Sequence, residues 1–585
     1  MGEKKRMLLL NDFGKCRNET NYQFSSLIEQ LGKYIDILEL WVRSQFMRPS
    51  INSAIAFSFF LVLIISWPVW GATYYIKTGG NDSLNGLSDL TAWGTIAKVN
   101  ATVKSGDTIY FRSQDTWTAS TGEYVLNAIA GVTYDGSTYG SGTRATLKPK
   151  AKLGVVHPAV VKINASNATV RGFNVDGNHQ DNGGIYIGMK ATSNISNIIV
   201  DDCKIHDIGG TDTYVYGVHV GGNIDPPITV SNVTITNTEL YNTVHEGFAI
   251  YPGWMAQGTN IVDTVLVRNC SAHEIGTASP GYGTDQNLCQ YSDGFSIAND
   301  SRNVTIEYSN SYKNCAGVSI SSSNLNRGYP TDFQIRYNTF HDNKIYGFGT
   351  VWGMAGVNST GSIYGNLFYN NGDTWKYNYS GDIIIQSMAG GTGIDYKNTV
   401  LNFYNNTIYS NPVSGGQRYG VSIGPFSPAA ASNPTLNFKN NIVYTTNRTG
   451  IFDQYQMLTN HSNNVIYRSS GAADEHVNNG TSYNRSGVKA WEASAHNTNP
   501  VFTGGTFPTG FTGTYGTNMV PNTMYFAITS GDAIDSGATL GSPYNGCING
   551  AGLAKAITRP QGAAYDIGAY EYKPLLGSPT GVKAK

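Results

Sequence analysis

Two acidic residues, Glu246 and Asp293, each precede a glycine that opens a short apolar segment. If these segments are adjacent strands of a parallel sheet, the two carboxyl groups lie about 5 Å apart. Like charges at that distance repel, so they require a cation, a shared proton or strong solvation. With Ca2+ the pair would be a metal site that supports β-elimination. As an acid and a nucleophile the pair would suit a retaining glycosidase. The alternative to both functions is that the two residues are solvated turn residues.

Other side chains near the pair in the repeat could complete such a site. Two histidines could act as the base: His219 and His245. Two tyrosines could donate the proton: Tyr216 and Tyr346. Four aromatic side chains could contact sugar rings, or could simply cover the edge of the core: Tyr251, Trp254, Tyr291 and Trp352. Two cations could neutralise an acidic sugar: Arg302 and Lys344.

The acid pair belongs to a repeat that runs through the middle of the chain. Segments such as VTITNTELYNTV, VTIEYSNSYKNC and LNFYNNTIYSN align, and most such segments are followed by a strand that begins with glycine. Successive glycines at positions 217, 247, 294, 317 and 347 are 30, 47, 23 and 30 residues apart. This period predicts one three-strand coil per repeat, with an inserted loop in the longest one. Alternating apolar residues of each strand would fill the interior.

Stacked coils turn aligned residues into columns in space. One column predicts an asparagine ladder at a turn: Asn338, Asn366, Asn406 and Asn441. The next predicts a ladder of stacked rings: His206, Tyr241, His273, Tyr312, His341, Tyr369, Tyr409 and Tyr444. A third predicts a surface ion-pair ladder of modest energy: Arg268, Glu307 and Arg336. Two CxxH segments, beginning at Cys203 and Cys270, are better explained by the repeat than by zinc.

Composition agrees with many short strands joined by tight turns. The chain has 68 glycines and 38 tyrosines, and only 14% of its residues are charged. The net charge of -1 and the absence of a basic run with interleaved aromatics in the body of the chain argue against a nucleic-acid partner. Six cysteines in 585 residues form no disulfide framework, so packing and hydrogen bonds must hold the fold.

An uncharged apolar stretch, residues 54–70, precedes the repeat, with Arg48 before it and small residues after it. This order is typical of a signal peptide over residues 47–72, which would make residues 1–46 a start-site artefact. The alternative is an uncleaved membrane anchor behind a cytoplasmic segment. Both interpretations place the body of the protein outside the cytoplasm, either secreted or at the cell surface.

Both ends of the chain differ from its middle. Residues 73–150 carry GGNDSLNG, a helix predicted over 95–103 and SGDTIYF, which indicates an N-terminal cap and the first coils. Residues 151–500 hold the repeats, and 501–585 form a predicted C-terminal cap with a final strand in AYDIGAYEY. Over about residues 73–572 these motifs resemble bacterial secreted proteins of the pectate-lyase-like superfamily. The resemblance implies an all-β fold, a right-handed parallel β-helix of three-strand coils with a short N-terminal helical cap.

That superfamily contains pectate, alginate and chondroitin lyases, polygalacturonase-like hydrolases, epimerases, phage tailspikes and proteins without known activity, so the fold alone does not give the reaction. The resemblance implies a polysaccharide bound along a groove. Asp201-Asp202 lacks the Gly and His elements that follow the paired aspartates of the hydrolases. We therefore expect an exported carbohydrate-active enzyme, lyase favoured over hydrolase, acting through Glu246 and Asp293 with Ca2+ as the candidate cofactor. The alternative is a non-catalytic glycan-binding or structural surface protein, and the sequence gives no oligomeric state.

Overall fold

The computed structural model describes residues 71–572, apart from 155–156, 211–214, 223–226, 254–259, 277–291, 322–327, 351–358, 373–379, 386–397, 412–417, 425–433, 454, 505–510, 513–519, 522–525 and 549–556. Residues 1–70, and with them the predicted signal peptide, lie outside the described part. No helix in the described part is both long and apolar enough to cross a membrane.

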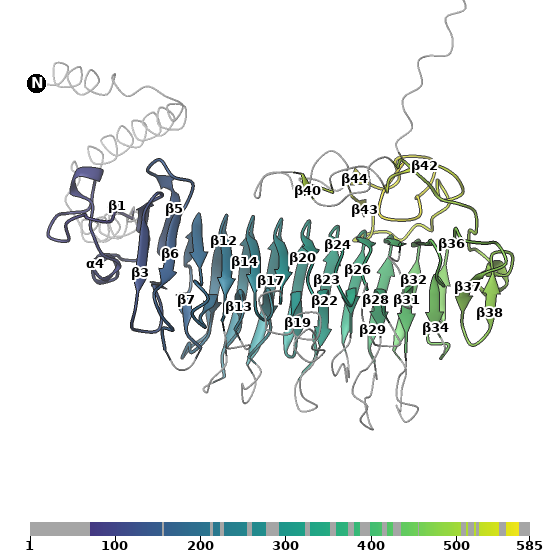
Figure 1. The fold of residues 1–585 in the computed structure, drawn as a ribbon, viewed down its shortest axis with the longest axis horizontal. Helices are drawn as coiled ribbons and strands as arrows, with labels where there is room; N and C mark the ends of the chain where they lie inside the picture. The colour runs from purple at the N-terminus through teal and green to yellow at the C-terminus, as the bar shows by residue number, and fades with distance from the viewer. Residues whose placement is uncertain are drawn as a thin grey trace, which may run out of the picture. The chain divides into compact units, whose positions relative to one another are not determined.

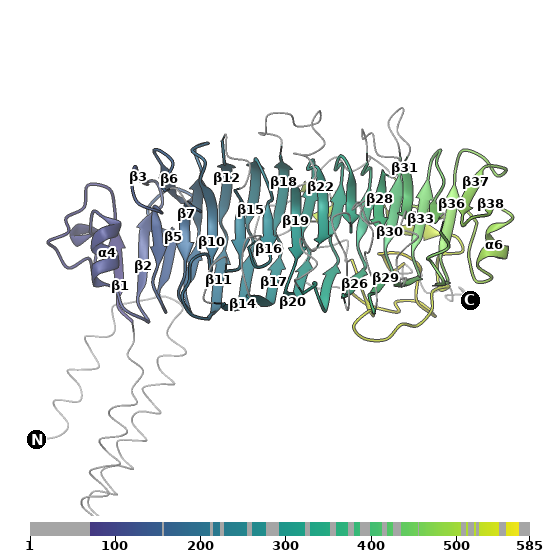
Figure 2. The same ribbon diagram turned by 90° about the horizontal axis from the view of Figure 1, so that it is seen from below.

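The described chain is a right-handed parallel β-helix, as the sequence predicts (Figure 1). Each coil contributes one strand to each of three sheets, which we call A, B and C and which contain 13, 12 and 13 strands. Because one coil separates sheet neighbours, paired strands are far apart in sequence. Figure 2 shows β16, β19 and β22 in this arrangement within sheet C.

The strands and helices have the following bounds. Sheet A consists of β1 (Thr73–Ile76), β2 (Thr108–Arg112), β5 (Thr133–Tyr139), β8 (Thr169–Arg171), β11 (Ile195–Asp201), β14 (Thr229–Thr236), β17 (Ile261–Arg268), β20 (Ser301–Glu307), β23 (Phe333–Arg336), β26 (Thr360–Tyr364), β29 (Val400–Tyr404), β32 (Thr435–Lys439) and β35 (Asn460–Ser462). Sheet B consists of β3 (Thr116–Ala119), β6 (Ala145–Pro149), β9 (Phe173–Asp176), β12 (Lys204–Ile208), β15 (Glu239–Thr243), β18 (Ser271–Ile275), β21 (Asn310–Tyr312), β24 (Thr339–His341), β27 (Leu367–Tyr369), β30 (Thr407–Ser410), β33 (Ile442–Thr445) and β36 (Val465–Arg468). Sheet C consists of β4 (Leu126–Ala128), β7 (Ala159–Ile163), β10 (Gly183–Ile187), β13 (Val218–Val220), β16 (Phe248–Ile250), β19 (Asp293–Ala298), β22 (Ala316–Ser321), β25 (Tyr346–Gly349), β28 (Ser380–Ile385), β31 (Arg418–Ile423), β34 (Ile451–Asp453), β37 (Glu475–Asn478) and the antiparallel β38 (Ser482–Asn484). The short pairs are β39 (Val501–Phe502) with β42 (Ile528–Ser530), β40 (Phe511–Thr512) with β41 (Val520–Pro521), and β43 (Gly546–Cys547) with β44 (Ile557–Thr558); the helices are η2 (Asp89–Thr91), α4 (Ile96–Thr102) and α6 (Val488–Trp491).

The interior is filled by aliphatic and phenylalanine side chains from all three sheets. In β14 the buried residues are Val230, Val233 and Ile235, and Asn232 at a φ of 52° shifts the alternation by one residue between them. Asparagine adopts this left-handed conformation more readily than most residues. The register sets Val233 beside Val265 of β17, so the same column continues into the next coil. Stacking therefore buries a face that one coil could not bury alone.

The predicted asparagine and ring ladders are confirmed. Asn406 accepts hydrogen bonds from the main-chain N and the side-chain Nδ2 of Asn366, at 3.0 and 3.1 Å, and donates to Asn441 at 3.0 Å. On sheet B the rings of Tyr312 and His341 stack at 5.0 Å between centroids, with planes 1° apart. Both ladders run parallel to the coil stack, which is why the register alone predicts them.

Two side-chain interpretations need refinement. The predicted ion-pair ladder of Arg268, Glu307 and Arg336 is present, but its centre is not on the surface: Glu307 is only 1% exposed and accepts hydrogen bonds from both arginines. Cys203 and Cys270 are free and buried, and their thiols donate to main-chain carbonyl oxygens. Burial raises the pKa of each thiol to about 12, so neither is a ready zinc ligand.

The N-terminal helix is present where the sequence predicts it. Thr95 caps α4 by accepting a 3.1 Å hydrogen bond from the main-chain N of Lys98, and Val99 is fully buried against the first coils. At the other end, the predicted strand in AYDIGAYEY is wrong. Residues 564–572 form turns with one bridge, between Tyr565 and Gly537.

The C-terminal segment, residues 526–548 and 557–572, packs against the side of the β-helix at the turns between sheets A and B (Figure 1). The Tyr544 ring packs edge-on against Tyr364 and Tyr404, at 5.0 and 4.8 Å between centroids. Ala569 donates its main-chain N–H to the Thr407 hydroxyl at 3.0 Å. This segment therefore covers several later coils rather than only the last one.

Candidate functional site

Glu246 and Asp293 are neighbours on the outer face of sheet C. The main-chain N of Gly247 donates to the carbonyl oxygen of Asp293 at 2.8 Å, and Phe248 pairs with Phe295 in the same register. The register continues one outer column: Tyr216, Glu246, Asp293, Ala316 and Tyr346. The spacing of the repeat thus places the two acids on adjacent coils, about 5 Å apart between strands.

Steric crowding requires glycine at the position after each acid. A Cβ on Gly247 would lie 2.5 Å from the carbonyl oxygen of Gly294, and a Cβ on Gly294 would lie 2.1 Å from the Ser311 hydroxyl. No side chain fits at such distances. Glycine lets the coils approach there, while the preceding acid lies on the outer face.

Both acids are buried, so the alternative of solvated turn residues is wrong. Glu246 is 6% exposed and Asp293 is 3% exposed. The Tyr251 hydroxyl donates to Oε2 of Glu246 at 2.7 Å, and the Ser319 hydroxyl is the hydrogen-bond partner of Asp293. Oδ1 of Asp293 has no hydrogen-bond partner among the described residues.

Burial and mutual repulsion raise the pKa values of the pair. Burial raises the pKa of Asp293 to about 8, although the Ser319 bond acts in the opposite direction. The pKa of Glu246 is also raised well above its ordinary value, first by burial and then by the charge of Asp293. Near neutral pH the two groups therefore share protons and titrate as one unit.

Tyrosine rings enclose the pair from neighbouring coils. Tyr251 and Tyr346 are 3% and 1% exposed, and burial followed by the charge of one of the acids raises the pKa of each hydroxyl well above its ordinary value. A Cβ on Gly349 would meet the Tyr346 ring at 2.5 Å, so this glycine gives the ring its space. Both phenols stay protonated and can donate hydrogen bonds to a carboxylate.

The two histidines proposed as bases both lie buried against Tyr216. His219 is fully buried, and its ring stacks on Tyr216 at 5.0 Å with Tyr186 and Tyr251 at 5.8 and 5.7 Å. Burial lowers the pKa of His219 to about 3, which makes it a weak base. His245 is 6% exposed and lies edge-on to Tyr216 at 5.5 Å.

The remaining predicted residues fall in different places. Arg302 is exposed on sheet A, in register with Asp263, so it does not join the acid pair on sheet C. Lys344 is half-buried just before β25, and burial lowers its pKa. Trp254, Tyr291 and Trp352 lie outside the described residues. Ser319 and Tyr186, which the sequence analysis missed, are found only through the register of sheet C.

Other buried carboxyl groups in the described part have strong partners. Asp382 accepts two hydrogen bonds from Asn371 and one from Ser410. Glu492 accepts from Asn464 and is bonded to His461. Glu307, as described above, has two arginines. The acid pair differs from these three in its small number of donors: Tyr251 and Ser319 are its side-chain partners, and Oδ1 of Asp293 has none among the described residues.

The described donor set does not complete a calcium site. Ca2+ takes six to eight oxygen ligands, whereas the described side chains bonded to the pair add two hydroxyl groups. One cluster of three potential metal ligands occurs among the described residues: Asp176, His206 and Asp207. It lies on sheet B, and Lys148 already binds Asp176 at 2.6 Å. Ca2+ at the acid pair therefore remains an untested prediction.

No protein-family model and no curated protein sequence matches the chain. Similar solved structures include pectate lyase Pel9A, with 16% identity, coverage of 86% of this chain and 96% of that chain, and a TM-score of 0.47. A GH136 lacto-N-biosidase from Eubacterium ramulus is 13% identical, with coverage of 69% of this chain and 65% of that chain and a TM-score of 0.41. A rhamnogalacturonan lyase is 18% identical, with coverage of 65% of this chain and 83% of that chain and a TM-score of 0.37. At these values the likeness says nothing about the reaction of this chain, and the fold assignment rests on its three sheets.

Proposed function

We propose that this protein is an exported carbohydrate-active enzyme that cleaves a polysaccharide, with Glu246 and Asp293 as its reaction centre. The observation that carries the proposal is the pair of adjacent buried carboxyl groups with raised pKa values and few hydrogen-bond donors. Such a pair destabilises a fold, and carboxyl pairs with perturbed pKa values are concentrated in active sites.

The protonation state favours cleavage of a glycosidic bond by acid catalysis. One carboxyl group that keeps its proton at neutral pH can protonate the leaving oxygen, and its ionised neighbour can act as nucleophile or base. The strand spacing of about 5 Å matches the separation used by retaining glycosidases. The Tyr251 hydroxyl would stabilise Glu246 in its ionised state.

The lyase reaction favoured by the sequence makes different demands on the same residues. It needs both carboxyl groups ionised around a bound cation, and a base, whereas burial favours a pair that keeps a proton and lowers the pKa of His219. Hydrolysis is therefore our first proposal and elimination the second.

Export is supported by the apolar stretch at residues 54–70 and by a disulfide at Cys315, since disulfides persist in oxidising compartments.

The test is product formation by the purified protein on a panel of neutral and acidic polysaccharides, with and without calcium. Reducing ends report cleavage of either kind, and the ultraviolet absorbance of unsaturated uronides reports elimination. We expect reducing ends without that absorbance, and a loss of at least about 100-fold in Glu246→Gln and Asp293→Asn.

Asp382→Asn is the matched control, because Asp382 is a fully buried carboxyl group of sheet C whose pKa is raised by burial to about 7. It should keep its activity. A calcium-dependent rise in ultraviolet absorbance would replace hydrolysis by elimination. Activity that survives in both pair variants would rule out Glu246 and Asp293 as the reaction centre. Inactivity on every substrate would favour the non-catalytic surface protein.

A further inference from the structure

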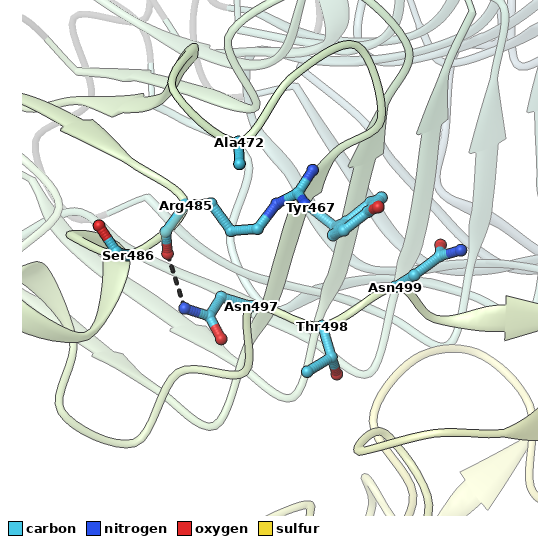
Figure 3. Close-up of a pocket in the computed structure, with 7 residues that line it drawn as sticks. All are labelled: Tyr467, Ala472, Arg485, Ser486, Asn497, Thr498 and Asn499. Atoms are coloured by element: carbon cyan, nitrogen blue, oxygen red, sulfur yellow. Dashed lines mark hydrogen bonds between the residues drawn. The ribbon is translucent and has the colours of Figure 1, made fainter.

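A pocket of about 480 Å³ is lined by residues at and after β36 (Figure 3). These strands lie near the C-terminal end of the β-helix, far along the coil stack from β16 and β19 (Figure 1). Tyr467 of β36 forms one wall, and the segment after β38 supplies Arg485 and Ser486. Amide and hydroxyl side chains complete the lining: Asn497, Thr498 and Asn499. The volume is in the range of small-molecule sites rather than of single ions.

Arg485 is held in place within this pocket. Its guanidinium lies over the Tyr467 ring, 4.5 Å from the ring centre, and its Nη2 donates to the carbonyl oxygen of Arg468 at 2.8 Å. Asn497 holds the same segment by donating to the Arg485 carbonyl oxygen at 2.6 Å (Figure 3). A guanidinium fixed in this way loses little entropy on binding an anion.

The charge of Arg485 is not neutralised within the described residues. No carboxylate there pairs with it, and its buried Nε has no hydrogen-bond partner among them. The nearby acids are engaged elsewhere: Asp474 lies 3.5 Å from Arg468, and Glu475 accepts from Thr449, Asn478 and Ser482. The pocket therefore offers one immobile cation and several neutral polar groups.

A smaller pocket of about 160 Å³ has a similar set of side chains, and its Arg468 directly follows Tyr467 of the first pocket in the chain. Its lining includes Tyr419, Arg448 and Arg468, and the buried Nε of Arg448 also has no partner among the described residues. Arg468 connects the two pockets, because it lines the second and its carbonyl oxygen accepts from Arg485. Two neighbouring cationic pockets suit a ligand whose negative charges repeat along a chain.

We propose that these pockets bind an acidic oligosaccharide, with Arg485 holding the carboxylate of one sugar and Arg448 that of another. A bidentate guanidinium–carboxylate contact provides the affinity, and the surrounding amides and hydroxyls suit a ligand rich in hydroxyl groups. The inference shares only the class of ligand with the proposed enzyme. Binding here is measured without turnover, so either proposal can fail alone.

The experiment is calorimetric titration of the Glu246→Gln protein with trisaccharides of galacturonate, glucuronate and mannuronate, with maltotriose as the neutral counterpart. We expect saturable binding of at least one acidic trisaccharide and none of maltotriose. Arg485→Gln should weaken that binding about tenfold or more, as expected for the loss of a charged hydrogen bond. Lys489→Gln, which removes the same charge from an exposed residue outside the pocket, should leave it unchanged.

Ala472→Trp tests the site by shape, since this exposed rim residue makes no side-chain hydrogen bond and the indole would fill the pocket. It should also abolish binding while the melting temperature stays unchanged. Three results would overturn the proposal: no binding of any acidic trisaccharide, wild-type affinity in the two pocket variants, or equal affinity for inorganic sulfate alone.

Discussion

At the scale of single residues, burial has opposite outcomes for different carboxyl groups. Asp135 is fully buried, yet hydrogen bonds from Thr138 and Ser137 outweigh burial and its pKa is lowered. Asp293 is almost as buried, and its pKa rises to about 8 because the Ser319 bond does not outweigh burial. The number of donors, rather than burial itself, decides whether a buried acid is charged.

This difference predicts opposite effects of the same substitution. Between about pH 4 and 8 the unfolded chain ionises Asp293 while the folded protein keeps it protonated, so the residue's contribution to stability falls as pH rises. Asp293→Asn cannot ionise. It should be more stable than the wild type at pH 8, on the order of 1–3 kcal/mol, and about equal to it at pH 4. Thermal unfolding at the two pH values measures this.

Asp135→Asn is the control, and we expect it to change the stability at pH 8 in the opposite direction. Its folded-state pKa is depressed, so its stabilising contribution is present above the ordinary pKa of 3.8 and lost as pH falls through the folded value. The substitution should therefore destabilise the protein at pH 8. Equal losses of stability at pH 8 in both variants would show that Asp293 is ionised and satisfied in the folded protein.

At the scale of elements, the interior and exterior asparagine columns have different energetic weight. Asn406 of the interior ladder is fully buried and bonds to Asn366, Asn441 and the carbonyl oxygen of Ile363. Asn437 belongs to a half-exposed column on sheet A and donates to Asn402 at 2.7 Å. Water can replace the lost bond at the second position but not at the first.

We therefore predict that Asn406→Ala costs roughly 3 kcal/mol of unfolding free energy, because it leaves buried amide and carbonyl groups of adjacent coils without partners. Asn437→Ala should cost less than about 1 kcal/mol. Hydrogen exchange of the flanking coils locates the loss, and the midpoint of denaturant unfolding measures its size. Equal costs would mean that the interior ladder adds no more than an exposed hydrogen bond.

At the scale of the whole molecule, the sequence predicts those features that depend only on local pattern and on the alignment of residues between successive coils. The column from Tyr216 to Tyr346, the Asn338–Asn441 ladder and α4 all follow from local pattern and period. Features that depend on side-chain enclosure do not follow. The burial of Glu246, the low pKa of His219 and the carboxylate at the centre of the Arg268–Arg336 ladder come from contacts between coils.

The path of the C-terminal segment was equally inaccessible to the sequence analysis, because its contacts join residues with no shared period. Asn440 accepts from the main-chain N of Ala538 and donates to its carbonyl oxygen, both at 2.8 Å. The sequence analysis singled out AYDIGAYEY, but no pattern in it indicates the buried ion pair that this segment forms with Arg559. Arg559 and Glu571 are both fully enclosed at the side chain, 2.7 Å apart.

This ion pair organises the docked segment. Arg559 donates to the carbonyl oxygens of Gly546, Asp566 and Gly568, and Glu571 accepts from the main-chain N of Gln561 and Asp566. Loss of one partner leaves the other charge buried and alone, which typically costs about 3–5 kcal/mol. The cost acts on the docked segment, because in the described part the coils hold themselves together through their own sheets.

Arg559→Met should therefore release the C-terminal segment without unfolding the β-helix. Limited chymotrypsin digestion should cleave after Tyr544 or Tyr565 much faster than in the wild type, while the strand signal in circular dichroism stays the same. Lys162→Met, which breaks a 3.3 Å pair to the half-exposed Glu123, should digest like the wild type. The opposite outcome is that Arg559→Met releases the C-terminal segment and unfolds the sheets in one transition. The docked segment would then be a structural part of the later coils rather than a cover added to them.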